Sequence, residues 1–209
     1  MLKEVSQDEM YKSKNPIIRY FHNRRLDMIV KLLGDTAGKK ILDVGCGDGF
    51  LLDKLRGKLF GVDVSPKRVK TAKERLGDKA TIIIADARKL PFRDQFFDVV
   101  VCSEVLEHIR NPDLVISEIF RVTKNGGVAI ITVPNEQIMC LGRLLMLKFP
   151  IKIPDHINSF KIADIERIIG AKADKVVFIP PVGEYICLFK LMRFRKKNRG
   201  FQCSNSAKK

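Results

Sequence analysis

Short apolar runs alternate with amphipathic stretches through most of the chain. The runs are bounded by Gly or Asp and occupy 40–44, 59–62, 80–84, 97–102 and 127–133. Between them, apolar residues recur at helical spacing over 48–56, 66–76 and 112–122. Continuous apolar strands separated by helices predict a parallel sheet that is covered on both faces. The pattern therefore predicts a doubly wound α/β fold.

The two ends of the chain depart from this alternation. Apolar positions over 17–33 follow one helical face, with Asn15-Pro16 as its start signal and Gly34 as its stop signal, so we expect residues 1–39 to form an N-terminal helical cap. Beyond residue 133 we expect a helix at about 160–169 and two β-like runs at 175–179 and 185–191. Pro180-Pro181 and Gly183 separate these two runs and indicate an antiparallel end to the sheet.

These patterns predict one main domain with two appendages. We expect the domain to cover 40–191, with a semi-apolar insertion or lid at 134–159, and residues 192–209 to form a flexible basic tail. The net charge is +15, and residues 190–209 contain bases but no acid. Such a tail is either simply solvated or contacts an anionic partner, for which a membrane surface is favoured over nucleic acid.

The cysteines and the apolar segments indicate the cellular compartment of the protein. The five cysteines form no C-x-x-C pair and no metal-ligand spacing, so we expect neither a disulfide framework nor a metal site. No continuous apolar segment has the length of a secretion signal or of a membrane span. We therefore expect a cytoplasmic protein that is at most peripheral to a membrane.

The segment from Ile41 to Phe50 carries the most specific signal. A buried strand leads into three glycines at alternate positions and then into a helix. Glycines let the backbone turn sharply and approach a ligand, and the start of a helix presents free N–H groups. A dinucleotide fingerprint needs a third small residue where Phe50 stands, and the chain has no P-loop sequence. A cradle for a polyphosphate is therefore incomplete.

Carboxylates follow three successive strands after this loop. Asp63 ends the second run and can accept hydrogen bonds from both hydroxyls of a ribose. Asp86 follows the third run and can accept from the exocyclic amine of adenine, and Glu104 follows the fourth. Each of them alone could serve as a turn or capping residue. Together they predict a site for an adenosine-containing ligand without phosphates.

The stretch from about 41 to 133 resembles the core of class I S-adenosylmethionine-dependent methyltransferases, in particular the small-molecule, type 11-like group. The motifs are I-L-D-V-G-C-G-D-G-F, G-V-D-V-S, A-D-A-R-K-L-P-F, F-D-V-V-V-C-S-E-V-L-E-H-I and G-G-V-A-I-I-T-V-P-N. The resemblance implies a Rossmann-like sheet of seven strands with an antiparallel last strand. It also implies S-adenosylmethionine as the cofactor and S-adenosylhomocysteine as the product.

The resemblance further implies roles for individual residues. The residues at the methionine end of the cofactor would be Asp43, Gly45, Cys46 and Gly47. The ribose and adenine would be held by Asp63, Val64, Asp86 and Ala87. Cys102 and Ser103 would lie beneath the sulfonium.

Methyl transfer from a sulfonium is an in-line displacement, and it needs a general base only when the acceptor is a hydroxyl or a protonated amine. Among the three histidines, we expect His108 to have a structural role, whereas the role of His22 stays open. His156 lies in an H-x-N-x-F segment that resembles one near the acceptor side of related methyltransferases. It is the candidate catalytic residue, or else it anchors the insertion to the domain.

We therefore expect a methyltransferase that acts on a small or lipid-like acceptor. The apolar residues of 134–159 suit an apolar acceptor, or a lid helix that packs on the domain. An RNA methyltransferase is a rival because the chain ends are basic, although Trp is absent and Tyr numbers only 3. A non-catalytic binding protein that kept the fold is the third hypothesis.

Overall fold

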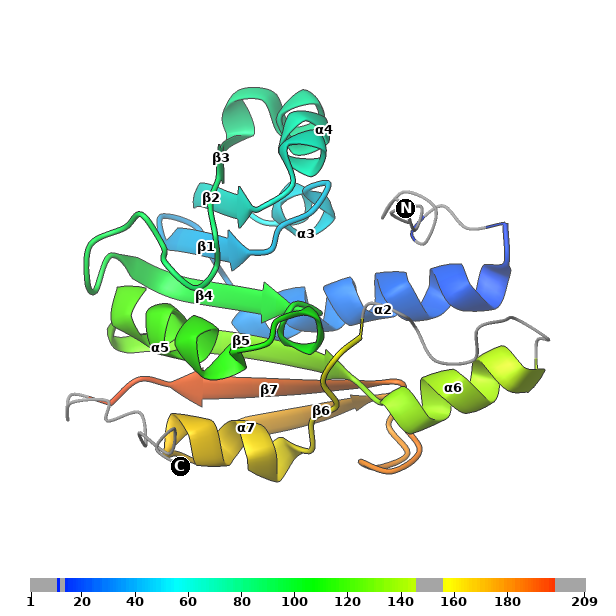
Figure 1. Ribbon diagram of the computed structural model, residues 1–209. Coiled ribbons are helices and arrows are strands. Elements are labelled where there is room, and N and C mark those ends of the chain that lie inside the picture. Colours follow the sequence, from blue (N-terminus) through cyan, green and yellow to red (C-terminus); the bar gives the residue numbers. More distant parts are fainter. Residues whose placement is uncertain (1–10, 12–13, 146–155, 198–209) are drawn as a thin grey trace.

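A seven-stranded sheet with the strand order β3-β2-β1-β4-β5-β7-β6 organises the computed structural model, which describes residues 11, 14–145 and 156–197. The strands are β1 (Lys40–Val44), β2 (Lys58–Asp63), β3 (Ala80–Ile84), β4 (Phe97–Ser103), β5 (Thr123–Pro134), β6 (Lys175–Ile179) and β7 (Phe189–Arg195). Strands β1 to β5 pair in parallel, and β7 pairs antiparallel with both β5 and β6 (Figure 1). The predicted doubly wound sheet with an antiparallel end is confirmed.

The helices begin and end close to their sequence signals. They are α2 (Pro16–Leu33), α3 (Phe50–Asp53), α4 (Pro66–Leu76), α5 (Pro112–Val122), α6 (Glu136–Leu145) and α7 (Ile162–Ile169), with short 3-10 turns η1 (Gly77–Lys79) and η2 (Leu106–His108). The side chain of Asn15 accepts the N–H groups of Ile17 and Ile18, and Ser65 accepts that of Arg68. These caps satisfy N–H groups that have no partner inside the helix.

Two helical layers cover the two faces of the sheet. Helices α5 and α7 pack on one face, whereas α2, α3 and α4 pack on the other (Figure 1). Side chains alternate along each strand, so Leu42 and Val44 join the first core cluster and Ile41 joins the second. Burying an aliphatic side chain of this size contributes about 1.5–3 kcal/mol relative to exposure. The same alternation places the carboxyl group of Asp43 on the side of α2.

The last strand extends beyond the expected end of the domain. The domain was predicted to end at 191, but β7 continues to Arg195. Met192 and Phe194 are buried in the α5 and α7 core cluster, and Lys196 donates hydrogen bonds to the carbonyl oxygens of Phe120 (2.6 Å) and Thr123 (2.8 Å). Residues 192–197 are therefore part of the folded domain, and the prediction of a flexible tail from 192 is wrong for them. Residues 198–209 lie outside the described residues.

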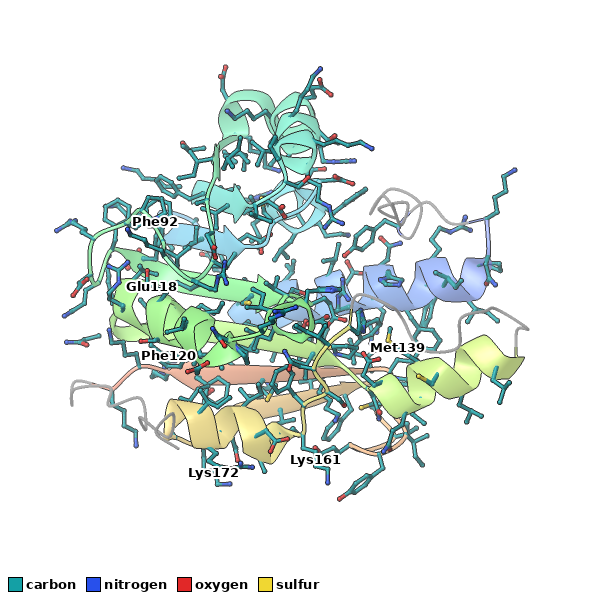
Figure 2. All side chains as sticks on the ribbon, in the orientation of Figure 1. Phe92, Glu118, Phe120, Met139, Lys161 and Lys172 are labelled. Atoms are coloured by element: carbon teal, nitrogen blue, oxygen red, sulfur yellow. The ribbon has the colours of Figure 1, made fainter. Side chains whose placement is uncertain are left out.

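The predicted insertion begins with a regular helix. α6 starts directly after β5, and its Met139 packs against the core cluster on the α2 side (Figure 2). Residues 146–155 lie outside the described part of the chain, and the chain is described again from His156. Within the described residues, no helix combines the length and the apolar composition that crossing a membrane requires.

Candidate functional site

The glycine loop between β1 and α3 lies at the carboxyl edge of the sheet. Gly45, Gly47 and Gly49 all have positive φ angles, of 72°, 53° and 83°. A Cβ atom at Gly45 would lie 2.3 Å from a methyl group of Val105, so a side chain there would be both strained and obstructed. The Gly45 N–H group donates to the Val62 carbonyl at 2.8 Å, which fastens the loop to β2.

Asp63 connects this loop to the next crossover. Its Oδ2 accepts the N–H group of Gly47 at 2.9 Å, and its Oδ1 accepts that of Ser65 at the same distance. The residue is buried, at 7% exposure. Each carboxylate oxygen has a second lone pair. Asp63 can therefore organise the loop and still accept a hydroxyl from a ligand, as the sequence predicts.

Asp43 is a buried carboxyl group behind the same loop. Burial, and the neighbouring Asp63 in addition, raise the pKa of Asp43 to about 8, although Arg25 acts in the opposite direction. The side chain is 3% exposed. A cationic ligand at this point would favour the ionised form. The site is therefore suited to a positively charged group.

Exposed apolar side chains lie next to the loop, at the ends of β2 and β3. Val64 is 70% exposed and Ile84 is 58% exposed, and Ile84 pairs with Asp63 in the sheet. Bare apolar surface beside hydrogen-bonding groups suits the flat face of a nucleobase. Ala87, which is partly buried, packs against the adjoining core.

Asp86 has a partner that sequence reasoning did not identify. The guanidinium of Arg88 binds both of its carboxylate oxygens, with Nε 3.0 Å from Oδ1 and NH2 2.6 Å from Oδ2. These hydrogen bonds lower the pKa of Asp86. Oδ1 also accepts the backbone N–H group of Arg88 at 2.8 Å, so Arg88 keeps Asp86 ionised and oriented.

Cysteine and serine side chains of the predicted site point in different directions. Cys102 is fully buried within the α5 and α7 core cluster, and burial raises the pKa of its thiol. Cys46 is buried in the cluster on the other face. Only the backbone of either residue can contact a ligand at the edge. The hydroxyl of Ser103 lies 2.9 Å from that of Thr132, at the ends of β4 and β5.

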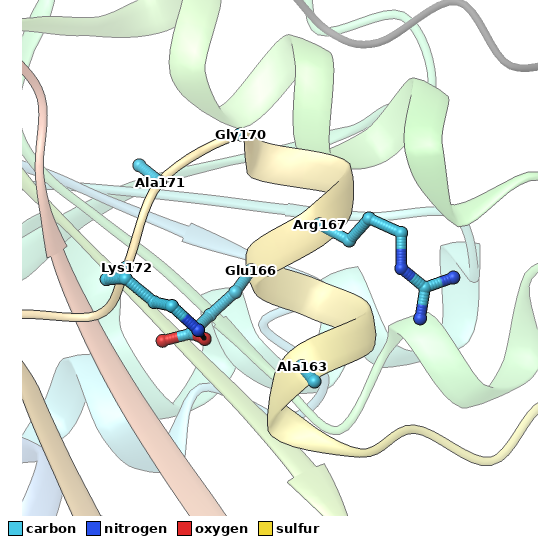
Figure 3. A pocket seen from close by; sticks show the side chains of 6 residues that line it. All are labelled: Ala163, Glu166, Arg167, Gly170, Ala171 and Lys172. Carbon is cyan, nitrogen blue, oxygen red and sulfur yellow. Dashed lines mark hydrogen bonds and ion pairs between the residues drawn. The ribbon is translucent and has the colours of Figure 1, made fainter.

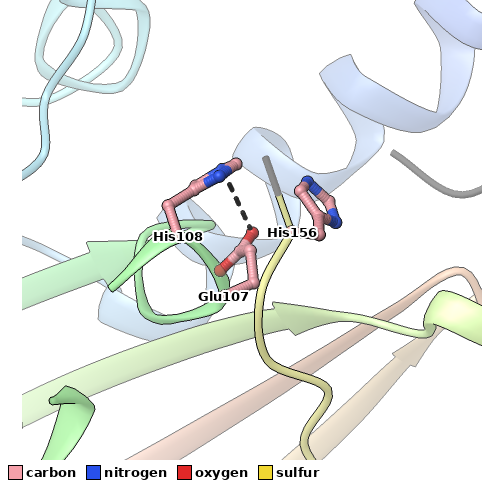
Figure 4. Close-up of side chains that lie close together, drawn as sticks. All are labelled: Glu107, His108 and His156. Atoms are coloured by element: carbon pink, nitrogen blue, oxygen red, sulfur yellow. Dashed lines mark ion pairs between the residues drawn. The ribbon is translucent and has the colours of Figure 1, made fainter. Parts of the chain in front are cut away.

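A cluster of histidines and glutamates follows β4. Nδ1 of His156 hydrogen bonds to Oε1 of Glu136. The ring centroids of His156 and His108 lie 4.7 Å apart, with Glu107 next to them (Figure 4). Glu107 lies beside both rings and is 1% exposed. Burial, and the nearby Glu104 in addition, raise the pKa of Glu107 well above its ordinary value. The structure thus joins the two histidines with two glutamates that the sequence analysis did not assign.

The N-terminal helix reaches into this cluster. NH1 of Arg25 lies 3.2 Å from Oε2 of Glu104, and NH2 donates to the hydroxyl of Tyr11 at 2.7 Å. Oε1 of Glu104 accepts the hydroxyl of Thr132 at 2.8 Å. Burial, and Arg25 in addition, lower the pKa of His22 on the same helix to about 3, so that its ring is neutral. Helix α2 therefore supplies a buried positive charge to the acidic edge.

A depression of about 320 Å³ lies away from this edge, along α7 (Figure 3). Its lining residues are Ala163, Glu166, Arg167, Gly170, Ala171 and Lys172. Lys172 and Glu166 pair there at 2.6 Å. None of the predicted site residues lines it, so the carboxyl edge is the better candidate for the functional site.

Comparison with known proteins identifies the domain. A family model described as "Methyltransferase domain" matches residues 42–131, the segment that carries the glycine loop and the strand-end carboxylates. This domain belongs to the class I S-adenosylmethionine-dependent methyltransferases. The cofactor of that family is S-adenosylmethionine.

Two relatives of the methyltransferase domain are ubiquinone biosynthesis O-methyltransferases. The protein of Shewanella halifaxensis is 33% identical over 65% of this chain and 63% of its own length. That of Nitrosomonas europaea is 35% identical over 49% of this chain and 47% of its own length. The chain therefore spans less than two thirds of these relatives.

Solved structures share the fold of the methyltransferase domain. Magnesium protoporphyrin IX methyltransferase from Synechocystis, solved with bound S-adenosylhomocysteine, has a TM-score of 0.69 at 20% identity and covers 91% of this chain and 93% of its own. The PH0226 protein from Pyrococcus horikoshii has a TM-score of 0.70 at 21% identity, covering 91% and 96%. At this level of identity, the likeness concerns the fold.

The residues of the methyltransferase domain fit this cofactor chemically. A sulfonium is a cation and suits the carboxyl group of Asp43, which is buried at 3% exposure behind the glycine loop. The carboxylate of Asp63 can accept hydrogen bonds from the hydroxyl groups of a ribose. The exposed Val64 and Ile84 offer apolar surface to an adenine. The donors and the apolar surface lie at one edge of the sheet, as the cofactor requires.

Proposed function

We propose that this methyltransferase domain transfers the methyl group of S-adenosylmethionine to a hydroxyl oxygen of a small acceptor with a largely apolar body. The observation that carries the proposal is the hydrogen bond between His156 and Glu136 at the acceptor side. A hydroxyl acceptor needs a group that accepts its proton, whereas many other acceptors do not. The names of the two O-methyltransferase relatives support the same class of acceptor.

On this proposal, the cofactor lies along the carboxyl ends of β1 to β4. Asp43 and the backbone of Gly45, Cys46 and Gly47 hold its methionine end. The remaining contacts are made by Asp63, Val64, Asp86, Ala87, the backbone of Cys102, and Ser103. When bound, the cofactor supplies a methyl group on a sulfonium that is already activated toward an oxygen nucleophile.

His156 is placed to handle the proton of the acceptor. An ionised Glu136 can only accept the hydrogen bond that joins it to Nδ1, so on this proposal Nδ1 carries the proton and Nε2 has the free lone pair. Nε2 can therefore accept the proton of a hydroxyl as the oxygen takes the methyl group. Glu136 then stabilises the imidazolium that forms, so it acts as a positioning residue.

The surface around this edge supports an acceptor with an apolar body. Leu141 and Leu144 of α6 are 49% and 45% exposed, and Ile17 and Tyr20 of α2 are 54% and 60% exposed. Figure 1 shows α2 and α6 extending on the side toward which the arrowheads of β1 and β4 point. Exposed apolar side chains can bury part of a hydrophobic acceptor.

The proposal is tested with two acceptors that carry the same alkyl tail but offer different nucleophilic atoms. A catechol bearing an alkyl tail and the matching aniline are each incubated with the protein and methyl-labelled cofactor. We expect label on the oxygen of the catechol and none on the nitrogen of the aniline. Calorimetry with S-adenosylhomocysteine, ATP and NADH checks the cofactor separately. Tight binding of ATP or NADH without binding of the sulfur compound would contradict the proposal.

A further inference from the structure

A second depression, of about 370 Å³, lies at the rim of the sheet opposite the glycine loop. It is formed where α2 ends and where β1, β4 and β5 begin, and the end of β7 lines it from the other side. Figure 1 shows this rim on the side toward which the arrowhead of β7 points. Its lining residues include none that we assign to the cofactor or the acceptor, so the depression is separate from the candidate methyltransferase site.

An irregularity in the pairing of β4 with β5 shapes one wall of the depression. The register of the two strands shifts at Asp98, and residues 124–127 of β5 bulge out of the ladder. The N–H group of Gly126 donates to the carbonyl oxygen of Lys196 at 2.8 Å, and the N–H group of Lys196 donates to that of Gly127 at 2.9 Å. The end of β7 thus fixes the bulge in place, so the wall exists before a ligand binds.

The charged side chains that line the depression are four cations and one carboxylate. They are Lys39, Lys124, Arg193 and Arg195 on one side of the balance and Asp98 on the other. Oδ1 of Asp98 lies 2.6 Å from Nζ of Lys124, and its Oδ2 accepts the N–H group of Lys40 at 2.8 Å. Burial acts in the opposite direction, but these hydrogen bonds lower the pKa of Asp98. The single carboxylate is therefore ionised and already paired with a lysine.

Two of the cations have no carboxylate partner among the described residues. NH2 of Arg193 lies 2.9 Å from Oδ2 of Asp174, so that guanidinium is paired. Lys39 and Arg195 instead each donate a hydrogen bond to a main-chain carbonyl oxygen, at 2.6 Å and 3.2 Å. An ammonium has three N–H groups and a guanidinium has five, so both keep donors for a ligand. The depression therefore combines two uncompensated positive charges with unused donors.

Apolar side chains line the depression as well. Leu32 and Val99 are 6% and 3% exposed, and Leu33 and Val128 are half-buried. A site that joins charged groups to apolar surface suits an organic molecule with an ionic group better than a bare inorganic ion. The volume is also in the range of sites for small molecules.

We propose that this depression binds a phosphate monoester, whose phosphate group contacts Lys39 and Arg195. Such a group carries about −1.5 to −2 charges at pH 7, which matches the two uncompensated cations. The guanidinium can hold two phosphate oxygens at once, and the ammonium supplies a compact positive charge. A carboxylate carries a single charge and would leave one of the two cations without a counter-charge.

The inference goes beyond the proposed methyl transfer and does not depend on it. The site lies at the beginning of the parallel strands, whereas the cofactor and the acceptor are assigned to their carboxyl ends. The phosphate can belong to a small soluble molecule or to the head group of a lipid, because both present the same dianion. The experiment therefore includes one probe for each source.

Isothermal titration calorimetry with phenyl phosphate at low ionic strength tests the soluble source. We expect one binding site per chain, and binding at least about tenfold weaker after Lys39→Gln or Arg195→Gln. Both side chains are exposed, so we expect these variants to fold as the unaltered chain does. The control Lys73→Gln removes one charge from an exposed position of α4 and should leave the affinity unchanged. Benzoate, which has one negative charge, should bind at least about tenfold more weakly than phenyl phosphate.

Sedimentation with phosphatidylcholine vesicles that contain phosphatidic acid tests the lipid source. Binding of either probe that Arg195→Gln weakens and Lys73→Gln does not would support the site, and the probe that binds identifies the source. Failure of both probes to bind, or equal binding by Arg195→Gln and Lys73→Gln, would overturn it. Benzoate that binds as tightly as phenyl phosphate would overturn the assignment to a phosphate. None of these results changes the expected methylation of the catechol, which tests the proposed function separately.

Discussion

The guanidinium of Arg25 in α2 lies 3.2 Å from the carboxylate of Glu104 at the end of β4. Both side chains are largely buried, at 6% and 15% exposure. Glu104 also has a positive φ of 58°, which is unusual for a residue with a side chain and concentrates at functional sites. The N-terminal helix is therefore more than a cover, because it neutralises one charge of the acidic edge.

Removing Arg25 alone should destabilise the domain strongly. Arg25→Met leaves Glu104 buried without its counter-charge, which costs about 3 kcal/mol or more of unfolding free energy. Arg25→Met combined with Glu104→Gln should recover a large part of this loss. Urea unfolding of the single and double variants measures the coupling. Arg24→Met, at an exposed position of the same helix, is the control and should change stability by less than about 0.5 kcal/mol.

Asp63→Ala should weaken the binding of S-adenosylmethionine. The substitution removes the acceptor of the Gly47 and Ser65 N–H groups as well as the proposed ribose contact. We expect a loss of at least about tenfold, since a hydrogen bond to a charged group is worth about 1.5–3 kcal/mol. Isothermal titration calorimetry measures it, with Asp78→Ala in the exposed η1 turn as the control. Equal affinities in the two variants would exclude Asp63 from the cofactor site.

The raised pKa of Asp43 makes stability depend on pH. The native carboxyl keeps its proton up to about pH 8, whereas the unfolded chain releases it near 3.8. The native state therefore binds more protons between these values, and the unfolding free energy falls as pH rises through this window, by up to about 1.4 kcal/mol per unit. Asp43→Asn should remove this contribution.

Urea unfolding at pH 5.5, 6.5 and 7.5 compares the two proteins. We expect the unaltered chain to lose stability relative to Asp43→Asn as pH increases. A difference between them that stays constant with pH would show that Asp43 is already ionised in the native protein.

Glu136→Gln should lower turnover without changing cofactor affinity. The amide can no longer stabilise a charged His156 ring, so kcat should fall by about 10²-fold while the Kd for S-adenosylhomocysteine stays within about twofold. His156→Ala should do the same. Steady-state kinetics and calorimetry on the same preparations provide the two readouts. If His156→Ala abolishes cofactor binding, its placement on the acceptor side is wrong.

Local patterns were sufficient to predict most of the elements but not the last strand. Helix α5 and strands β1 and β3 start and end where their apolar patterns do. The apolar run at 185–191 also predicts a strand, but β7 begins only at Phe189. Tyr185 and Ile186 lie before this strand and are 74% and 62% exposed. The position of β7 depends on its pairing with β5, where Phe189 opposes Pro134. Such pairing is a long-range property that a run of apolar residues does not contain.

The candidate site likewise combines residues that a local sequence pattern indicates with contacts that depend on long-range packing. The glycine loop and Asp63 were predicted because the strand, the turn and the carboxylate are close in sequence. The contacts of His156 with Glu136 and of Arg25 with Glu104 depend on how distant elements pack. Cys102 shows a further limit, because the direction of a side chain at a strand end follows from the face it occupies in the assembled sheet.

Because β7 runs antiparallel to the other central strands, the basic residue at its end lies far from the rim that would bind the substrate. Arg195 opposes Val128 near the beginning of the parallel strands, so it lies at the rim opposite the glycine loop. A polyanion drawn to Arg195 would thus be held a full strand length from the rim at which methylation would take place. Substitutions at Arg195 would therefore change the attraction of the protein to a polyanion without changing which substrate it methylates.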